Sequence, residues 1–125
     1  KQKTAYEIST RDWSSDVCSS DLLAELPPHG TGIDVAPQLR EDLSVITHGG
    51  EPVMTPVGST AVRAFVERVQ PVLSLHGHIH ESRGITRLGR SVVINPGSAY
   101  STGALYGAIV TLKDGKVEAQ QLTTG

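Results

Sequence analysis

Three histidines at alternate positions are the residues of this sequence best suited to chemistry. His76, His78 and His80 stand in the run His-Gly-His-Ile-His, directly after a short apolar stretch. In an extended backbone, residues i and i+2 point to the same side, so we expect His78 and His80 to share one face. Two imidazoles on one face can reach two metal ions about 3.5–4 Å apart, the spacing of two-metal hydrolase sites. Gly77 is expected to let the backbone turn and approach such a site closely.

The same spacing also has a purely structural interpretation. Alternating histidines near a strand end occur as exposed or hydrogen-bonded residues without any metal, so spacing alone leaves both interpretations open. We assign His76 a structural or supporting role, because another residue would serve as well at its position. Arg83, Arg87 and Arg90 follow the histidines. These arginines could contact an anionic substrate or could be solvated charges of a hairpin. The second interpretation is favoured, because most arginines in proteins are exposed.

A helix and a strand are predicted to position the histidines. Ser59 can cap the free N–H groups of the first helical turn. Residues at helical spacing then form one apolar face, and these are Val62, Phe65, Val66 and Val69. Pro71 ends the helix because it cannot continue the hydrogen-bond ladder. Residues 72–75 are predicted to be a short strand that leads into the histidines.

The remaining segments read as loops and hairpins. Residues 26–34 are predicted to be a loop, 43–47 a short strand and 48–57 a second, turn-rich loop. Residues 85–88 and 91–95 should pair across Gly89, with 92–94 as a buried strand, and Asn-Pro-Gly-Ser at 95–98 should form a turn. A second hairpin of 107–112 and 116–122 is expected around Asp114-Gly115, a strong turn signal.

Length and composition restrict the classes of function. The chain has 125 residues and a formal net charge of -2, which fits one small domain and does not indicate a nucleic-acid partner. No apolar run approaches the roughly 20 residues that span a membrane, so we expect no membrane partner. A single cysteine, Cys18, cannot form an internal disulfide and is compatible with a reducing compartment. The cytoplasm is the default expectation.

Residues 1–22 differ from the rest of the chain. They show neither helical nor strand periodicity, they contain the only Trp and the only Cys, and they lack the pattern of a signal peptide. They resemble a translated sequencing-library adapter: 1–7 match one frame of a flow-cell primer, 12–22 match the adjoining adapter arm, and 8–11 fill the place of an index. We therefore expect 1–22 to be an unstructured artefact and 23–125 to be a truncated domain.

Three blocks of the sequence carry a family resemblance. Residues 77–80, Gly-His-Ile-His, resemble the last signature of the calcineurin-like metallophosphoesterases, Gly-His-x-His. Residues 27–34 resemble the loop with the preceding signature, and Asn-Pro-Gly-Ser at 95–98 is typical of bacterial and archaeal members. The resemblance covers roughly residues 23–122. It implies an α/β fold, namely an incomplete C-terminal portion of the four-layer α/β/β/α metallophosphoesterase sandwich with antiparallel hairpins at its C-terminal end.

The resemblance also implies a chemistry. Members of the family hold two divalent ions (Mn²⁺, Fe²⁺, Zn²⁺ or Ni²⁺) and hydrolyse phosphomonoesters or phosphodiesters with a metal-activated hydroxide. By this resemblance His78 would ligate the second metal and His80 the first. The family's lone His is expected two residues before the Pro-Pro pair, where this chain has Glu25, a possible metal ligand through oxygen. Asn95 and Ser98 would support or line the site, together with His76 and Gly77.

The sequence departs from the family pattern in one large respect. The blocks Asp-x-His, Gly-Asp-x-x-Asp and Gly-Asn-His are not found in it, so the catalytic residues are unknown and we expect no turnover by this chain alone. Three functions stay open: a phosphoester hydrolase in the intact parent, a decayed interaction scaffold of the same fold, or a simple metal-binding module. Glu25 favours the scaffold. The sequence specifies neither the substrate nor the oligomeric state.

Overall fold

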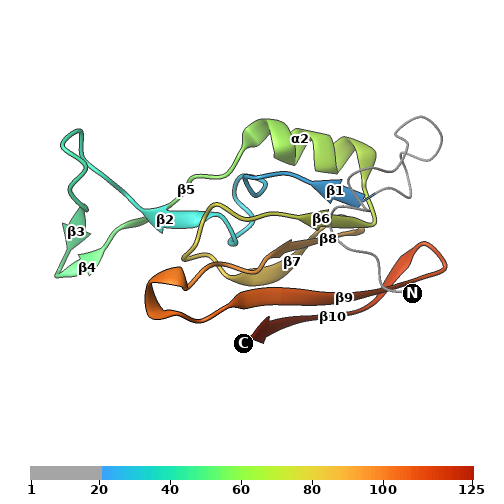
Figure 1. Cartoon of the computed structure of the whole chain (residues 1–125). Coiled ribbons are helices and arrows are strands. Elements are labelled where there is room, and N and C mark those ends of the chain that lie inside the picture. Colours follow the sequence, from blue (N-terminus) through green and yellow to red (C-terminus); the bar gives the residue numbers. More distant parts are fainter. Residues whose placement is uncertain (1–20) are drawn as a thin grey trace.

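The computed structural model describes residues 21–125, which form a mixed α/β arrangement of mostly strands with one α-helix in that range (Figure 1). The described elements in chain order are β1 Asp21–Leu23, β2 Val35–Pro37, β3 Thr47–His48, β4 Glu51–Pro52, β5 Met54–Pro56, α2 Thr60–Val69, β6 Leu73–Leu75, β7 Gly84–Leu88, β8 Ser91–Asn95, the 3₁₀ helix η1 Tyr100–Thr102, β9 Tyr106–Lys113 and β10 Lys116–Thr124.

A four-stranded sheet forms the centre of the molecule. Its strand order is β1-β6-β8-β7, with β6 parallel to β1 and β8, and β7 antiparallel to β8. Val92, Val93 and Ile94 of β8 are all buried, which confirms the predicted buried strand. Because side chains alternate along a strand, Val92 and Ile94 share one face with the core residue Leu73, while Val93 faces the other side. A continuous apolar run is typical of a strand covered on both faces.

The sheet is covered by the helix on one side and by the C-terminal hairpin on the other (Figure 1). The hairpin side chains that pack on the core are Ala108, Val110, Val117 and Leu122. The result is three layers: α2, the mixed sheet, and the two-stranded sheet of β9 and β10. The predicted α/β class with C-terminal hairpins is confirmed at this level.

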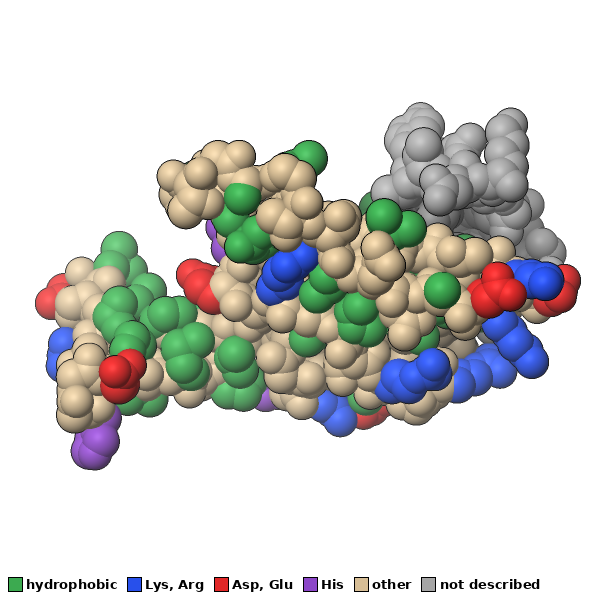
Figure 2. Space-filling view, turned by 90° about the horizontal axis from the view of Figure 1, so that it is seen from below, with side chains coloured by type: hydrophobic (Ala, Val, Ile, Leu, Met, Phe, Trp, Pro, Cys, Tyr) green, Lys and Arg blue, Asp and Glu red, His purple; other side chains and the backbone are tan. Residues whose placement is uncertain are grey.

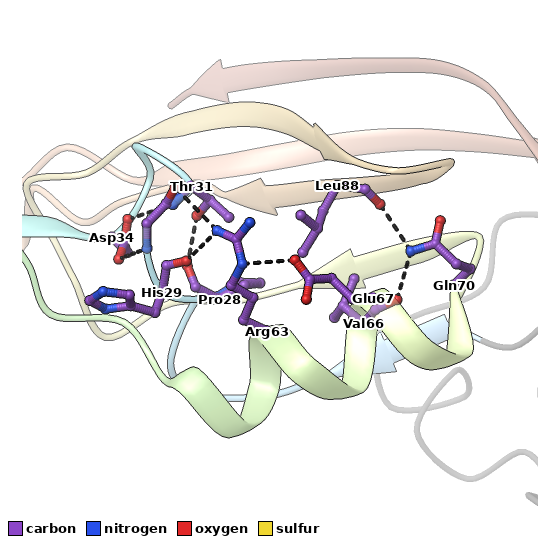
Figure 3. A network of polar contacts seen from close by, with 10 residues as sticks. Pro28, His29, Thr31, Asp34, Arg63, Val66, Glu67, Gln70 and Leu88 are labelled. Atoms are coloured by element: carbon purple, nitrogen blue, oxygen red, sulfur yellow. Dashed lines mark hydrogen bonds and ion pairs between the residues drawn. The ribbon is translucent and has the colours of Figure 1, made fainter.

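The helix begins and ends as its sequence predicts. The Ser59 hydroxyl accepts a hydrogen bond from the Val62 N–H at 3.1 Å, which satisfies a free donor of the first turn. Val66 is fully buried against the sheet. Gln70 follows the last turn in the left-handed conformation (φ 52°). Its side-chain amide donates to the carbonyls of Val66 at 2.8 Å and Leu88 at 3.3 Å, so the end of α2 is tied to β7 (Figure 3).

Both predicted hairpins are present. Strands β7 and β8 pair across Gly89, and β9 and β10 pair over a longer stretch than predicted. Asp114 and Gly115 both have positive φ, 51° and 69°, as the tightest hairpin turns require.

Residues 35–57 form an arm that projects from the body (Figure 1). Within it β2 pairs with β5 and β3 with β4, both antiparallel. The predicted strand at 43–47 is wrong over most of its length: Leu43 has φ 67° and lies in a turn, Val45 makes an isolated bridge with Leu39, and Thr47 alone belongs to a strand, β3. The predicted loop at 48–57 is also wrong, since it contains β4 and β5. Strands of two or three residues that include prolines show no alternation in sequence.

Hydrophobic side chains gather on the arm, at the left of Figure 2. The exposed ones in the arm are Leu39, Leu43, Val45, Met54 and Val57. No helix in the described part of the chain has the length and apolar character needed to cross a membrane.

The N-terminal boundary needs a correction. Asp21 and Leu22, expected in the unstructured segment, belong to β1 and pair with Leu73 and Ser74 of β6. Ladder hydrogen bonds are made by backbone groups, so a segment without side-chain periodicity can still pair with a strand. The rest of the predicted artefact, residues 1–20, lies outside the described residues.

Candidate functional site

The histidine loop, residues 76–82, is not extended. Strand β6 ends at Leu75, and the ladder continues for one residue through the His76 N–H, which donates to the Ile94 carbonyl at 2.9 Å. The Ile79 N–H then donates to the Gly77 carbonyl at 2.7 Å, and His78 between them has φ 64°. A hydrogen bond from i to i+2 around a residue with positive φ defines a γ-turn. The expected sharing of one face along an extended segment is therefore wrong.

The conformational freedom expected of Gly77 falls on its neighbour: the residue in the left-handed region is His78, whereas Gly77 has no positive φ. A Cβ atom at Gly77 would meet nothing within 4 Å, so among residues 21–125 no neighbour requires glycine there, and its approach to a metal site stays a prediction. A β-carbon-bearing residue rarely adopts the conformation of His78. The turn therefore places strain on the histidine itself.

His78 lies against Glu25. Its Nδ1 is 3.1 Å from Glu25 Oε1, and the two side chains are 55% and 79% exposed. The backbone brings them together: the Ala24 N–H donates to the Leu75 carbonyl at 3.1 Å, and the Gly77 N–H donates to the Glu25 carbonyl at 3.0 Å. The segment after β1 thus runs beside the histidine loop and carries Glu25 to the His78 imidazole.

The distance between the two donor atoms, 3.1 Å from His78 Nδ1 to Glu25 Oε1, is that of an ion pair. Two ligand atoms about 2.1 Å from a metal lie about 3.0 Å apart at the right angles of octahedral coordination and about 3.4 Å apart at the tetrahedral angle, so the pair could chelate one octahedral ion with little movement. Imidazole suits Zn²⁺, Ni²⁺ and Fe²⁺, and carboxylate suits Mn²⁺. Within residues 21–125, no group of three or more His, Cys, Asp or Glu side chains could hold a metal. The described part therefore offers two donors to an ion.

His80 lies apart from this pair. Its ring packs edge-on against Tyr100, with centroids 5.5 Å apart and an interplanar angle of 80°, a favourable aromatic geometry. Its carbonyl accepts from the Ser98 N–H at 3.2 Å. Both His80 and Tyr100 are exposed. The structure therefore brings Glu25 and His78 together and places His80 beside an aromatic ring at the surface.

His76 is turned into the interior and is only 5% exposed. Its Nδ1 lies 3.1 Å from the Ala24 carbonyl and its Nε2 lies 2.6 Å from the Ser74 hydroxyl. A carbonyl can only accept, so Nδ1 donates to it and Nε2 accepts from the hydroxyl. Burial lowers the pKa of His76 from 6.5 to about 4, although the hydrogen bond to the Ala24 carbonyl opposes that shift. The neutral ring has no nitrogen left for a metal.

The turn after β8 lies directly behind the histidine loop. Asn95 is fully buried, and its amide donates to the carbonyls of Ile79 at 2.9 Å and Ile33 at 3.1 Å. Its Oδ1 accepts from the Gly97 N–H at 3.0 Å. Gly97 has φ 71°, and a Cβ there would lie 2.9 Å from the His80 carbonyl oxygen. The two loops are therefore in backbone contact, and Asn95 fixes their separation.

Asp34 organises the neighbouring loop, which sequence reasoning treated only as a block. It is fully buried. Its carboxylate accepts backbone N–H groups of Gly30 at 2.7 Å, Thr31 at 3.0 Å, Gly32 at 3.1 Å and Gly58 at 3.2 Å. The signal was present in the sequence, since an Asp just after Gly-Thr-Gly can close on their N–H groups.

Arg63 of α2 holds the same loop from the other side (Figure 3). Its Nη1 donates to the His29 carbonyl at 2.8 Å and its Nε donates to Glu67 at 2.8 Å. The His29 ring points away from Arg63 in Figure 3. His48 lies in β3 at the outer part of the arm (Figure 1). Neither histidine joins His78.

Arg83 acts as a brace. Its guanidinium donates to the carbonyls of Pro96 at 3.2 Å and Thr123 at 2.8 Å, and it lies over the Tyr106 ring at 4.3 Å. These contacts hold the hairpin β9–β10 to the turn behind the histidines. These contacts are structural. They differ from the solvated charge that the sequence favoured for Arg83, and a substrate contact at this residue stays a prediction.

Comparison of the chain with protein-family models, with curated proteins and with solved structures found no match. A function must therefore be argued from the site and not from a fold-level analogy.

Proposed function

We propose that this chain supplies metal ligands to a phosphoester hydrolase of the calcineurin-like metallophosphoesterase kind, and that it is a portion of that family's α/β/β/α sandwich. The observation that carries the proposal is the 3.1 Å contact between Glu25 Oε1 and His78 Nδ1. Glu25 stands where the family resemblance calls for a lone His, and His78 stands at the first His of Gly-His-x-His. Two segments far apart in sequence meet at those two positions.

The strained turn at His78 supports the same proposal. A non-glycine residue held at positive φ costs on the order of 1–3 kcal/mol, and such strain concentrates at functional sites. Here φ is 64°, and the Ile79 N–H and carbonyl on its C-terminal side are both hydrogen-bonded. The surrounding contacts therefore hold an imidazole in a position that relaxed backbone would not give it.

The ligand set favours a particular kind of ion. Bound divalent metals would lower the pKa of a coordinated water and neutralise charge on a phosphoryl group. Glu25 and His78 would hold one ion, and the exposed His80 is available to a second. A carboxylate in place of an imidazole shifts preference from Zn²⁺ and Ni²⁺ toward Mn²⁺. The substrate would be a phosphomonoester or phosphodiester that reaches the open side of the loop.

One observation favours the alternative of a catalytically decayed scaffold. Only two donors gather in the described range of the chain, and the arm exposes apolar side chains that suit a protein partner. A scaffold would bind one ion weakly or none, and would show no metal-dependent hydrolysis in any longer form of the protein.

Calorimetric titration with Mn²⁺ and Zn²⁺ tests the proposal. We expect one site in the chain, weakened about tenfold or more by His78→Ala or Glu25→Gln, with Zn²⁺ bound more tightly than Mn²⁺ as the Irving–Williams order requires. His48→Ala, an exposed histidine in the arm, is the matched control and should leave both affinities unchanged. Absence of binding, or equal binding by His78→Ala, would remove the metal site and with it the phosphoesterase assignment.

The same site predicts how the chain behaves as a catalyst. With two donors gathered, we expect no Mn²⁺-dependent hydrolysis of bis(p-nitrophenyl) phosphate. Turnover that disappears in His80→Ala would contradict this expectation and would mean that the site is more complete than the Glu25–His78 pair.

A further inference from the structure

A single buried hydroxyl joins the histidine loop to the root of the arm. Ser82 is 5% exposed, and its hydroxyl donates to the Val35 carbonyl at 2.6 Å. The same oxygen accepts from the Val35 N–H at 2.8 Å. One side chain thus satisfies both backbone groups of a residue that is distant in sequence.

Val35 depends on this contact because of its place in the β2–β5 ladder. It is the first residue of β2 and lies opposite Pro56 of β5. The Val57 N–H donates to the Asp34 carbonyl at 2.8 Å, and hydrogen-bonded pairs alternate along an antiparallel ladder, so both backbone groups of Val35 point away from β5. Backbone groups away from water require a partner. Ser82 therefore takes the place that a neighbouring strand would otherwise fill.

Ser82 is also tied to the strained turn. Its N–H donates to the Ile79 carbonyl at 3.2 Å, the carbonyl that also accepts from the Asn95 amide at 2.9 Å. The Ile79 N–H closes the γ-turn around His78. A continuous series of hydrogen bonds, joined through Ser82 and Ile79, therefore runs from the root of the arm to the turn that presents the imidazole.

Close packing reinforces the same junction. The Asn95 amide binds the Ile33 carbonyl at 3.1 Å as well as Ile79. A Cβ added at Gly84 would lie 2.7 Å from Ile33 Cγ2, so the two segments touch without space between them. Beyond this junction the arm projects from the body (Figure 1). A displacement of the arm at its root would act on the histidine loop.

We propose that Ser82 is a positioning residue for the candidate metal site: it locks the histidine loop to the arm, holds the His78 imidazole beside Glu25, and couples the position of the arm to metal binding. This inference rests on the proposed metal function. It goes beyond that function by naming the contact through which a partner on the arm would change the affinity for the ion.

Three variants of the full chain test the proposed positioning role of Ser82. Ser82→Ala removes the hydroxyl, and Ser82→Thr retains it. Ser91→Ala is the matched control, because Ser91 is equally buried and its hydroxyl has no hydrogen-bond partner among residues 21–125. The two readouts are the Mn²⁺ dissociation constant from calorimetry and amide hydrogen exchange at Val35 and Ile79 by NMR.

In Ser82→Ala we expect Val35 and Ile79 to exchange about tenfold faster, since a buried donor loses its partner and the turn loosens. The Mn²⁺ dissociation constant should rise about tenfold. Ser82→Thr should restore both values to within about threefold, and Ser91→Ala should match the wild type. A role in stability alone would lower the unfolding midpoint and leave the affinity of the folded chain unchanged, which would overturn the proposal.

The experiment distinguishes an error in the proposed metal function from an error in the proposed role of Ser82. If the wild-type chain binds no Mn²⁺, the proposed function is wrong, and Ile79 exchange still decides about Ser82. Faster exchange of the Ile79 amide in Ser82→Ala but not in Ser91→Ala supports the role of Ser82 in holding the histidine loop. Equal exchange of Ile79 in the two variants contradicts it.

Discussion

Replacing His78 by glycine and by alanine separates the cost of its backbone conformation from the value of its side chain. Both variants lose the imidazole and its contact with Glu25, an exposed pair of a kind worth about 0–1 kcal/mol. They differ in the backbone. Alanine at φ 64° keeps a strain of about 1–2 kcal/mol. Glycine has no such strain but loses about 0.5–1 kcal/mol more to chain entropy on folding.

We therefore expect His78→Gly to be more stable than His78→Ala by roughly 0.5–1 kcal/mol, although both variants should bind Mn²⁺ about tenfold or more weakly at this site. Urea unfolding followed by circular dichroism measures the difference, with the slope checked for each variant. Gln121 in β10 is the control, because it is exposed and has no positive φ. There the order should reverse, with glycine about 0.5–1 kcal/mol less stable than alanine. If alanine is the more stable at both positions, the argument for a strained turn is wrong.

Three further predictions follow from the same region. Because the pKa of His76 is lowered from 6.5 to about 4 in the folded chain, the unfolded chain binds more protons between these pH values. The free energy of unfolding should therefore fall by about 3 kcal/mol as the pH drops from 7 to 4. In His76→Gln the urea midpoint should fall less over the same pH range. Glu25→His should raise the affinity for Zn²⁺ and Ni²⁺ relative to Mn²⁺, since imidazole suits these ions better; an unchanged order in calorimetry would contradict a ligand role for residue 25. Gly97→Ala should destabilise more than Gly115→Ala by about 1–2 kcal/mol in thermal unfolding, because both have positive φ but only at Gly97 would the Cβ meet neighbours; equal losses would show that the loops do not touch.

Local chemistry explains what could be predicted from the sequence. The helix could be predicted because Ser59 caps it, apolar residues repeat at its period, and Pro71 follows it. The hairpins were readable because Gly89 and Asp114-Gly115 mark turns between β-rich runs. In each case a few neighbouring residues determine the conformation, and the structure has these elements within a few residues of the predicted bounds.

The parts that the sequence did not reveal depend on distant contacts. The γ-turn at His78 is held by partners such as Asn95 and Ser82, and although histidine is enriched among non-glycine residues at positive φ, that conformation is too rare for the residue type alone to predict it. The arm was missed because its strands are short and contain prolines. The Glu25 contact with His78 required β1 to pair beside β6, a pairing that side-chain pattern does not encode.

The most direct test of the central claim follows the histidine rings during a Zn²⁺ titration by long-range ¹H–¹⁵N NMR. Glu25 and His78 as joint ligands predict that the ring nitrogen signals of His78 shift first and saturate with one ion, while those of His29 and His48 stay in place. His76, with both nitrogens engaged inside the protein, should not respond. Equal shifts at all exposed histidines, or no shift at His78, would contradict a metal site at this turn.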